Sequence, residues 1–399
     1  MYLSYFDKFK NNPDYLTIEE DDWAYIKKTF SKEDVRESLA IVAHSYPMPC
    51  PVLTEEDAYK EFRKLKGVTW NDLVKEGKWF SRGEYDYDLT DMYFRRINIG
   101  NAASNYFQIK NRWSVGSVGF SSPESTWNSI QQLYGVMGSA YSLKVPKINR
   151  GVLRTMLELR KYICSQFKPN VAKVIYDHYE AKNILDFSMG WGDRLAGFYA
   201  SDFGEHYVGL DPRKENHPIY KKQAEFYDSK LTFFEHKRKG TFYCSPAEDF
   251  DFSPYKDYFD LVFTSPPYFN VERYSNDDNQ SWVRYKQIND WNELFLHKVL
   301  HNLWSAVRSG GVVLINISDV YNNKSKEGGW HKICDPMNDY LKSLGGEYLG
   351  CMGMEMTKRP NNGGARTVVD ERNWSDDMRK SEDAALEVFC EPVWMWRKK

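Results

Sequence analysis

One stretch of the sequence reads Leu261-Val262-Phe263-Thr264-Ser265-Pro266-Pro267-Tyr268-Phe269-Asn270. Its first, apolar residues indicate the end of a buried strand, and the consecutive Pro266 and Pro267 forbid that strand from continuing. The chain must leave the sheet there, at the strand end where open α/β sheets bind ligands. It leaves with Ser265 and Tyr268 close together in sequence. Taken alone, Ser-Pro-Pro-Tyr is equally typical of a proline turn capped by a packed tyrosine.

A second stretch, upstream, favours a ligand site. It reads Asn183-Ile184-Leu185-Asp186-Phe187-Ser188-Met189-Gly190-Trp191-Gly192-Asp193-Arg194-Leu195-Ala196-Gly197. An apolar run ends in an acid, Gly190 and Gly192 follow, and a helical pattern then begins. This is a strand, a tight turn and a helix whose N-terminus a ligand can approach closely. Asp211 follows the next short apolar strand, where an acid is placed to bind both hydroxyls of a ribose.

These features in order resemble the S-adenosylmethionine-dependent amino-methyltransferases of DNA, whose hallmark is (Asp/Asn/Ser)-Pro-Pro-(Tyr/Phe). The resemblance covers roughly residues 165 to 399 and is most specific from Thr264 to Tyr268. It implies an α/β fold with a class I, Rossmann-like methyltransferase sheet and S-adenosylmethionine as the cofactor. Alternating helices and apolar strands also predict a mainly parallel sheet, and a final pair of strands without an intervening helix predicts one reversed strand.

The resemblance also implies which residues contact the cofactor. In the family, an aromatic turn before the glycine strand packs beside the methionine portion, which indicates Phe167 and Pro169. The family's acid that accepts from the adenine amino group is replaced by Pro246, so Glu248 or Asp249 is expected to serve instead. The expected cofactor-binding residues are Phe167, Pro169, Asp186, Ser188, Gly190, Gly192, Asp211, Glu248 and Thr264.

The chemistry explains the motif. A methyl sulfonium is a strong electrophile, so the protein has mainly to orient the acceptor. Acceptors on both N–H groups of a base's amino nitrogen would localise its lone pair, and the Ser265 hydroxyl and the Pro266 carbonyl are the candidates. Tyr268 would stack on a base flipped out of the duplex. The expected catalytic residues are Ser265, Pro266, Pro267 and Tyr268, with no metal ion.

The acceptor is the less determined part of the hypothesis. In the family, serine at the first motif position is commoner among cytosine-N4 enzymes, which favours cytosine N4 in DNA over adenine N6. An RNA base amino-methyltransferase is an alternative, because single strands are easier to enter. A cofactor-binding but inactive nucleic-acid-binding subunit is another, although Asp186, Asp211, Ser265 and Tyr268 are all present.

The composition of the chain bears on its binding partners and its cellular compartment. The net charge of the 399 residues is only −2, so any affinity for nucleic acid must come from a local basic surface. Aromatic residues make up 16% of the chain, which leaves material for stacking on bases. The six cysteines form no Cys-x-x-Cys pair, and no apolar run is long enough to span a membrane. These features favour a soluble protein of a reducing, cytoplasmic compartment.

The N-terminal part reads differently. Residues 1–165 are expected to form a mainly helical lobe that recognises the target, ahead of a methyltransferase domain at 166–399. Residues 101–120 mix aromatic and basic side chains with glycines, and we interpret them as a loop that holds phosphates or stacks bases, or alternatively as one packed inward. A basic, glycine-rich loop at 358–366 is suited to contact phosphates or base edges, or alternatively is solvated surface. The expected nucleic-acid-binding residues are Arg112, Arg359 and Arg366.

Overall fold

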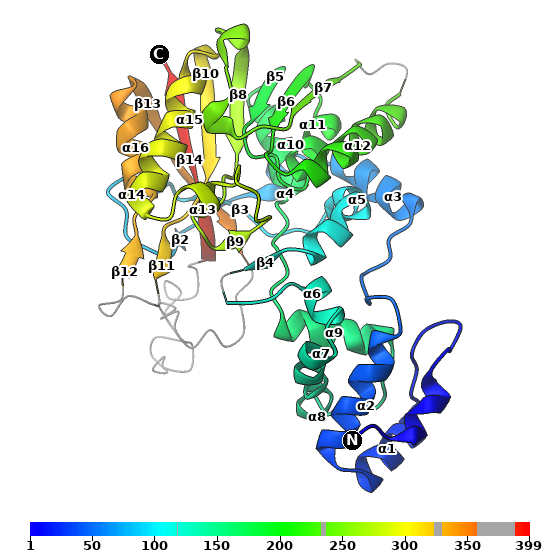
Figure 1. The fold of residues 1–399 in the computed structure, drawn as a ribbon. Coiled ribbons are helices and arrows are strands. Elements are labelled where there is room, and N and C mark those ends of the chain that lie inside the picture. Colours follow the sequence, from blue (N-terminus) through cyan, green and yellow to red (C-terminus); the bar gives the residue numbers. More distant parts are fainter. Residues whose placement is uncertain (118, 233–236, 323–328, 357–387) are drawn as a thin grey trace, which may run out of the picture. The chain divides into compact units, whose positions relative to one another are not determined.

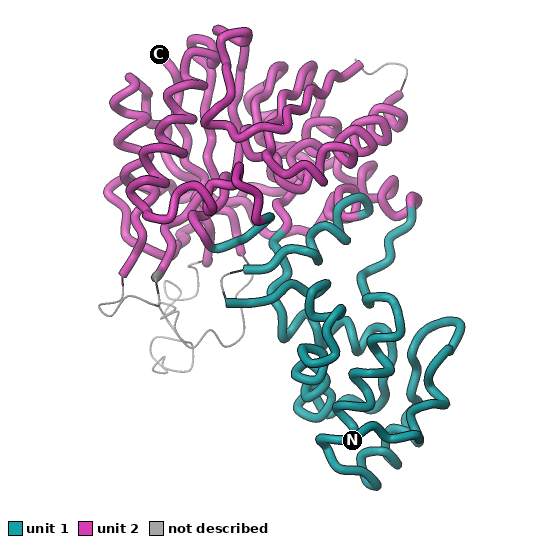
Figure 2. The backbone as a smooth tube through the Cα atoms, viewed as in Figure 1, with its two compact units in different colours: residues 1–54, 106–165, 271–275 teal, residues 55–105, 166–270, 276–399 magenta. Residues whose placement is uncertain are grey.

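The computed structural model describes residues 1–117, 119–232, 237–322, 329–356 and 388–399 (Figure 1). They form two compact units, of which unit 1 holds residues 1–54, 106–165 and 271–275 and unit 2 the remainder (Figure 2). The sequence places residues 55–105 in an N-terminal lobe, whereas the structure groups them with unit 2. None of the helices in the described ranges has both the length and the apolar character needed to cross a membrane.

Unit 1 is mainly helical and has its own core. Ser31 caps the N-terminus of α2 by accepting from the Asp34 N–H, as the capping spacing predicts. The core contains Trp23, Leu39, Trp113 and Leu157. The elements are η1 (Ser4–Phe9), α1 (Glu20–Thr29), α2 (Lys32–His44), α6 (Pro123–Trp127), α7 (Ile130–Met137), α8 (Ser139–Ser142) and α9 (Arg150–Arg160), with the paired strands β4 (Gly116–Ser117) and β9 (Glu272–Arg273).

The loop interpretation of residues 101–120 is wrong for its first part. Residues Asn101–Trp113 form helix α5. The buried side of this helix carries Ser104, Gln108 and Arg112 at four-residue intervals. Because these buried residues are polar, the helical spacing leaves no apolar periodicity in the sequence.

Unit 2 is built on a sheet whose strand order is β1-β3-β13-β14-β10-β8-β5-β6-β7, with β2 paired to β14. The strands β10, β8, β5, β6 and β7 run parallel to one another, and β14 is antiparallel to both β10 and β13. The predicted mainly parallel sheet with a reversed strand is confirmed. The strands are β1 (Val74–Glu76), β2 (Trp79–Phe80), β3 (Met92–Phe94), β5 (Asn183–Asp186), β6 (His206–Leu210), β7 (Lys239–Tyr243), β8 (Phe259–Thr264), β10 (Val307–Asn316), β13 (Gly346–Glu355) and β14 (Val388–Lys398), with a separate pair β11 (Val320–Asn322) and β12 (Gly329–His331).

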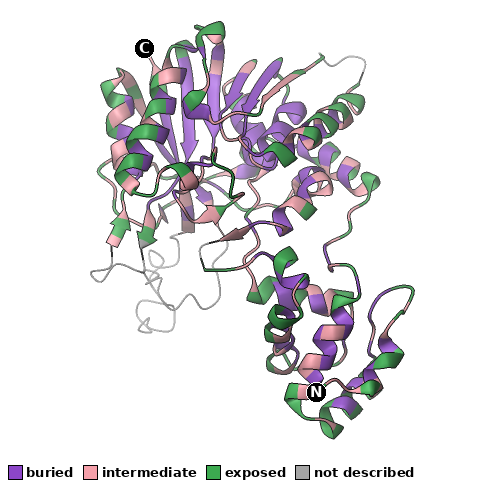
Figure 3. Ribbon diagram, in the orientation of Figure 1, coloured by how far each residue is buried: buried purple, intermediate pink, exposed green. Residues whose placement is uncertain are grey.

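Helices cover both faces of this sheet. Leu185, Val262 and Val313 share a core with η5, α15 and α16, whereas Phe263, on the opposite face, contacts Tyr176 of α10. The central strands are therefore buried on both sides (Figure 3), which explains their continuous apolar runs. The helices are α3 (Glu55–Lys66), α4 (Trp70–Leu73), α10 (Pro169–His178), α11 (Asp193–Ala200), η2 (Lys214–Asn216), α12 (His217–Ser229), η3 (Ala247–Asp249), η4 (Ser253–Tyr255), α13 (Ser281–Arg284), α14 (Ile288–Asp290), π-helical η5 (Trp291–His297), α15 (Lys298–Trp304) and α16 (Cys334–Ser343).

Candidate active site

The Ser-Pro-Pro-Tyr stretch lies at the carboxyl end of β8, where the strand stops at Thr264. The Thr264 hydroxyl is buried and donates to Asp186 Oδ1 at 2.9 Å, which joins this strand end to that of β5. Ser265 is the first residue outside the strand, and Pro266 behind it is buried. The two motifs singled out in the sequence therefore meet at one edge of the sheet.

The backbone after the prolines is tightly constrained. The Pro267 carbonyl accepts from the Phe269 N–H at 3.1 Å, and Phe269 has a φ of 50°. A bulky residue rarely adopts this left-handed conformation without support from its surroundings. The buried Phe269 ring packs edge-on against Trp291 and His331. This packing fixes the direction in which the neighbouring Tyr268 leaves the turn.

Two residues that the sequence reasoning missed bond the Ser265 and Tyr268 hydroxyls. Asn316, the last residue of β10, accepts from Ser265 Oγ at 3.3 Å and from the Tyr268 hydroxyl at 3.4 Å, both through Oδ1. Glu391 of β14 accepts from the same Tyr268 hydroxyl at 3.2 Å. Asn316 carries a detectable signal, because it is a polar residue at the end of an apolar strand, as Ser265 is.

Burial raises the pKa of Tyr268 well above its ordinary value, and the charge of Glu391 raises it further. Tyr268 therefore remains a neutral hydrogen-bond donor at physiological pH. The residue as a whole is partly exposed, so a flat ligand can approach it.

The glycine turn follows β5. Gly190 and Gly192 have φ values of 55° and 73°, in the region that glycine alone adopts readily. A Cβ on Gly192 would lie 2.5 Å from Gln223, so that position has no room for a side chain. A Cβ on Gly190 would meet only the Ser188 carbonyl, at 3.9 Å, so the space at Gly190 is open.

Asp186, at the end of β5, stabilises the conformation of this turn. Its fully buried carboxylate forms an ion pair with Arg194 of α11 at 2.8 Å and accepts from the Tyr207 hydroxyl at 2.6 Å. The Ser188 N–H donates to it at 3.2 Å, and the Ser188 carbonyl accepts from Arg194. Both Asp186 oxygens are thus bonded by protein donors, and Asp186 and Ser188 act on the shape of the turn.

Asp211 faces the turn from the end of β6. Its carboxylate accepts from the Gly190 N–H at 3.0 Å and from the Arg213 N–H at 2.8 Å. Burial raises the pKa of Asp211 to about 6, against the effect of these two hydrogen bonds. At neutral pH the carboxylate is ionised and is suited to accept from hydroxyl groups.

Phe167 and Pro169 lie where the aromatic turn leads into α10. Pro169 is the first residue of α10, and its carbonyl would be 2.8 Å from a Cβ on Gly197, which shows how closely α10 and α11 approach. The Phe167 ring packs edge-on against Phe263 and lies 4.9 Å from the Arg194 guanidinium. Phe167 therefore links the glycine turn to β8.

Glu248, expected to accept from the adenine amino group, is buried and already has protein partners. Arg284 donates to it at 3.0 Å and the Tyr285 hydroxyl at 3.3 Å. Burial raises the pKa of Glu248. Arg284 also pairs with Asp249 at 2.6 Å. The segment that contains Arg284 and Tyr285 thus bonds directly to η3, and Glu248 anchors it.

Only one of the three expected nucleic-acid contacts lies within the described residues. Arg359 and Arg366 lie outside the described residues. Arg112 is only 8% exposed, and its guanidinium donates to the Cys164 carbonyl at 2.7 and 3.2 Å. The phosphate contact expected of Arg112 does not fit this burial, because a phosphate-binding side chain must be accessible.

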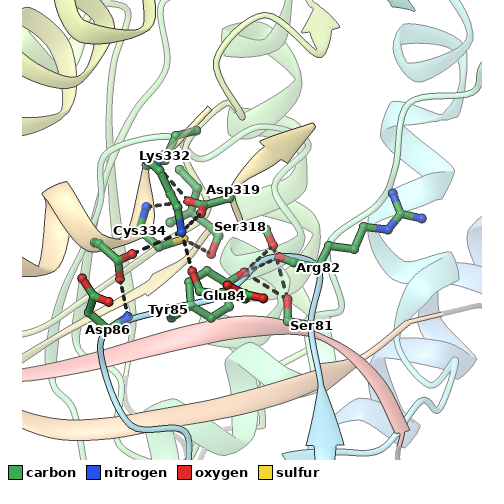
Figure 4. A network of polar contacts seen from close by, with 12 residues as sticks. Ser81, Arg82, Glu84, Tyr85, Asp86, Ser318, Asp319, Lys332 and Cys334 are labelled. Atoms are coloured by element: carbon green, nitrogen blue, oxygen red, sulfur yellow. Dashed lines mark hydrogen bonds and ion pairs between the residues drawn. The ribbon is translucent and has the colours of Figure 1, made fainter. Parts of the chain in front are cut away.

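A polar network of buried and exposed side chains continues from β10 beyond Asn316 (Figure 4). Asp319 accepts from the Ile333 and Cys334 N–H groups at 2.8 and 3.0 Å, which fixes the start of α16. Lys332 reaches between Asp319, at 3.3 Å, and the Glu84 carbonyl. Burial raises the pKa of Cys334 well above its ordinary value, so the thiol stays neutral. The network thus holds the chain on both sides of α16's first turn.

No three His, Cys, Asp or Glu side chains within the described ranges come together in a way that could hold a metal ion.

The strand order β13-β14-β10-β8-β5-β6-β7, in which β14 alone is reversed, defines a Rossmann-like α/β fold, the class I methyltransferase sheet. The short strands β1 and β2, which lie outside this set, are reversed as well. No protein-family model matches the chain, and no curated protein is a significant match.

Solved structures that resemble the chain include an S-adenosylmethionine-dependent methyltransferase of Clostridium acetobutylicum, with 11% identity, 58% of this chain and 89% of that chain covered, and a TM-score of 0.32. Another is the methyltransferase domain of bacterial CtHen1, with 10% identity, coverage of 57% and 96%, and a TM-score of 0.34. A protein of echinomycin biosynthesis that converts a disulfide into a thioacetal has 16% identity, coverage of 57% and 80%, and a TM-score of 0.35.

Proposed function

We propose that this protein transfers a methyl group from S-adenosylmethionine to the exocyclic amino group of a base in DNA, with cytosine N4 favoured over adenine N6. The observation that supports this most directly is the meeting of the two motifs. The glycine turn with Asp211 and the hydroxyls of Ser265 and Tyr268 lie at the carboxyl ends of the neighbouring strands β5 and β8. A cofactor on the first and a base on the second would be side by side.

The residues at the glycine turn fit the cofactor. Gly190 offers open space at close range to the backbone, and the ionised Asp211 beside it can accept from both ribose hydroxyls. When bound there, the cofactor supplies an electrophilic methyl group. The Phe167 ring lies beside the Arg194 guanidinium at the same turn, where it would contact the rest of the cofactor.

The chain's own residues would orient the acceptor base. Ser265 Oγ and the Pro266 carbonyl accept from the two N–H groups of the amino nitrogen, which turns its lone pair toward the incoming methyl. The constrained backbone at Phe269 holds Tyr268 in one direction, so its ring can stack on the base. Serine at the first motif position is the feature that favours cytosine N4.

The test is methyl transfer to separate pools of duplex DNA, single-stranded DNA and RNA from radiolabelled S-adenosylmethionine. Digestion and mass spectrometry of the labelled pool identify the product base. Labelled N4-methylcytosine in DNA is the expected result. Label on adenine N6 would overturn the base preference, label on RNA alone would replace DNA as the substrate, and cofactor binding without transfer to any pool would identify an inactive subunit.

Two serine variants make this assay specific. Ser265→Ala should lower the single-turnover rate and leave cofactor affinity unchanged, because the hydroxyl acts on the amino nitrogen. Ser305→Ala is the matched control, since Ser305 lies just before β10, at the opposite end of that strand from Asn316. Equal rates for both variants would assign Ser265 a structural role.

A further inference from the structure

Asn316 is the residue of this site that the motifs do not include. It is 1% exposed, and its amide touches three groups that surround the Ser-Pro-Pro-Tyr stretch. Nδ2 donates to the Pro392 carbonyl at 2.9 Å. Oδ1 is the atom that Ser265 and Tyr268 approach, at 3.3 and 3.4 Å.

These partners fix the orientation of the amide. A backbone carbonyl can only accept, so the NH₂ group of Asn316 must face Pro392. The opposite orientation would place two oxygens against each other there. Oδ1 is therefore the atom that faces Ser265, and it has no proton to give.

The orientation of the amide then fixes the Ser265 hydroxyl. Because Oδ1 can only accept, the Ser265 hydroxyl donates in the hydrogen bond that joins it to Asn316. The Tyr268 oxygen is a second acceptor beside Ser265, but a phenol oxygen accepts more weakly than an amide oxygen. A serine hydroxyl has one proton and two lone pairs. Once the proton points at Asn316, the lone pairs face away from it.

The Tyr268 hydroxyl does not compete for that role. It has one proton and lies closer to Glu391 Oε2, at 3.2 Å, than to Asn316 Oδ1. Hydrogen bonds to carboxylates are also stronger than those to amides. The Tyr268 hydroxyl therefore donates its hydrogen bond to Glu391, and Asn316 Oδ1 remains available to Ser265.

The position of Asn316 is itself well supported. The next residue, Ile317, accepts from the Trp394 indole at 3.1 Å through its carbonyl. Asn316 also pairs in register with Val393 of β14. The amide is thus held by strand pairing on one side and by the following turn on the other.

We propose that Asn316 is a positioning residue for methyl transfer. It accepts the hydrogen bond that the Ser265 hydroxyl donates, which leaves the lone pairs of Ser265 Oγ free to accept from the base's amino group. This inference rests on the proposed function. An amino N–H can only donate to Ser265, and a hydroxyl proton turned toward it would oppose that contact. In this way Asn316 supplies, through serine, the acceptor character that a first-position asparagine or aspartate would supply directly.

The test compares three variants in single-turnover methyl transfer at saturating cofactor and DNA. Asn316→Ala should lower the rate by about tenfold, which corresponds to ~1.4 kcal/mol, with affinities for cofactor and DNA within about twofold of wild type. Asn316→Asp should retain most of the rate, because burial favours a protonated aspartate, which keeps a donor toward the Pro392 carbonyl and an oxygen acceptor toward Ser265.

Asn338→Ala is the control for loss of a buried amide. Asn338 is fully buried in α16 and accepts from the Trp396 indole at 3.0 Å, so its removal should lower stability without lowering the methyl-transfer rate. A rate loss in Asn338→Ala equal to that in Asn316→Ala would overturn the positioning role.

A double variant asks whether Asn316 acts through Ser265. In the Ser265→Ala background, Asn316→Ala should cause little further loss of rate, because the hydroxyl that it orients is gone. Independent, multiplying losses would overturn the inference. Wild-type protein that methylates no nucleic acid would overturn the proposed function and this inference with it, whereas active wild type with a fully active, folded Asn316→Ala variant would overturn the inference alone.

Discussion

Burial favours the protonated form of the Asp211 carboxyl group, whereas binding of ribose hydroxyls favours its ionised form. Its pKa of about 6 means that the cofactor meets an ionised carboxylate only above that pH. We expect affinity for S-adenosylmethionine to be constant above pH ~6 and to fall by up to tenfold per pH unit below it. Asp211→Asn should weaken binding by about 1 to 3 kcal/mol at pH 7 and abolish this pH dependence. Calorimetric titrations from pH 5 to 8 measure both effects.

The same carboxyl group should also affect stability, in the opposite direction. Its folded pKa exceeds the ordinary value of 3.8, so the folded protein retains a proton that the unfolded chain has released. The resulting stabilisation is present below pH 3.8 and is lost as the pH rises through about 6. The unfolding free energy of wild type should therefore fall relative to that of Asp211→Asn across this range. Parallel pH profiles for the two proteins would contradict the raised pKa.

At the residue scale, the sequence could reveal those site residues that belong to one contiguous motif. Ser265, Tyr268 and Asp211 stand beside prolines, glycines or strand ends that reveal their position. Asn316 and Glu391 are distant from Tyr268 in sequence, by 48 and 123 residues, and the pairing of β10 with both β8 and β14 brings them together. Such contacts follow from sheet order, which no local pattern contains.

At the scale of elements, the ion pair of Asp186 with Arg194 joins the end of β5 to the first turn of α11. The side chains are 0% and 4% exposed. Burial opposes the charge of Arg194, but Asp186 more than compensates and raises its pKa. Arg194→Met leaves a buried carboxylate without its cation, and we expect a loss of about 3 to 5 kcal/mol in the free energy of unfolding in urea.

An exposed pair on the same sheet is the control for this change. Lys182 and Glu205 lie 2.8 Å apart with 59% and 50% of their side chains exposed, so Lys182→Met should cost less than about 1 kcal/mol. Asp186→Asn combined with Arg194→Met should cost less than the sum of the single changes. Similar losses in Arg194→Met and Lys182→Met would show that solvent reaches the Asp186 pair.

Helices and strands could be predicted from the sequence where the buried residues are apolar. The apolar runs of β8 and β10 indicate strands because both faces of the sheet are covered. α5 is the counterexample, since its buried Ser104, Gln108 and Arg112 resemble a polar loop in sequence. Side-chain to backbone bonds such as that of Arg112 to Cys164 make this burial tolerable, and they depend on tertiary structure.

For the whole molecule, two separate cores predict two unfolding steps. Unit 1 and unit 2 each bury their own apolar cluster. Scanning calorimetry should show two transitions, and S-adenosylmethionine at about 100 times its dissociation constant should stabilise only one of them, by about 2.7 kcal/mol. At the same cofactor concentration, Asp211→Asn should reduce this shift by about 1 to 2.4 kcal/mol, because its affinity is weaker by about 1 to 3 kcal/mol. A single transition that moves as a whole would show that the units unfold as one.

The division into units is also the property that the sequence reported least well. Residues 55–105 lie between two segments of unit 1 yet belong to unit 2, because β1 and β3 extend the sheet at β13. Reading along the chain favours contiguous domains. Only strand pairing across a large sequence separation overrides that expectation.

This pairing constrains the order of events during synthesis. β2 and β3 emerge from the ribosome early, but their partners β14 and β13 are made some 260 to 310 residues later. Residues 74–94 must therefore wait without their partners in β13 and β14, paired at most through β1 and β3, while the parallel strands from β5 to β10 already assemble. One edge of the sheet closes last, and until it does the growing chain exposes strands open to wrong partners.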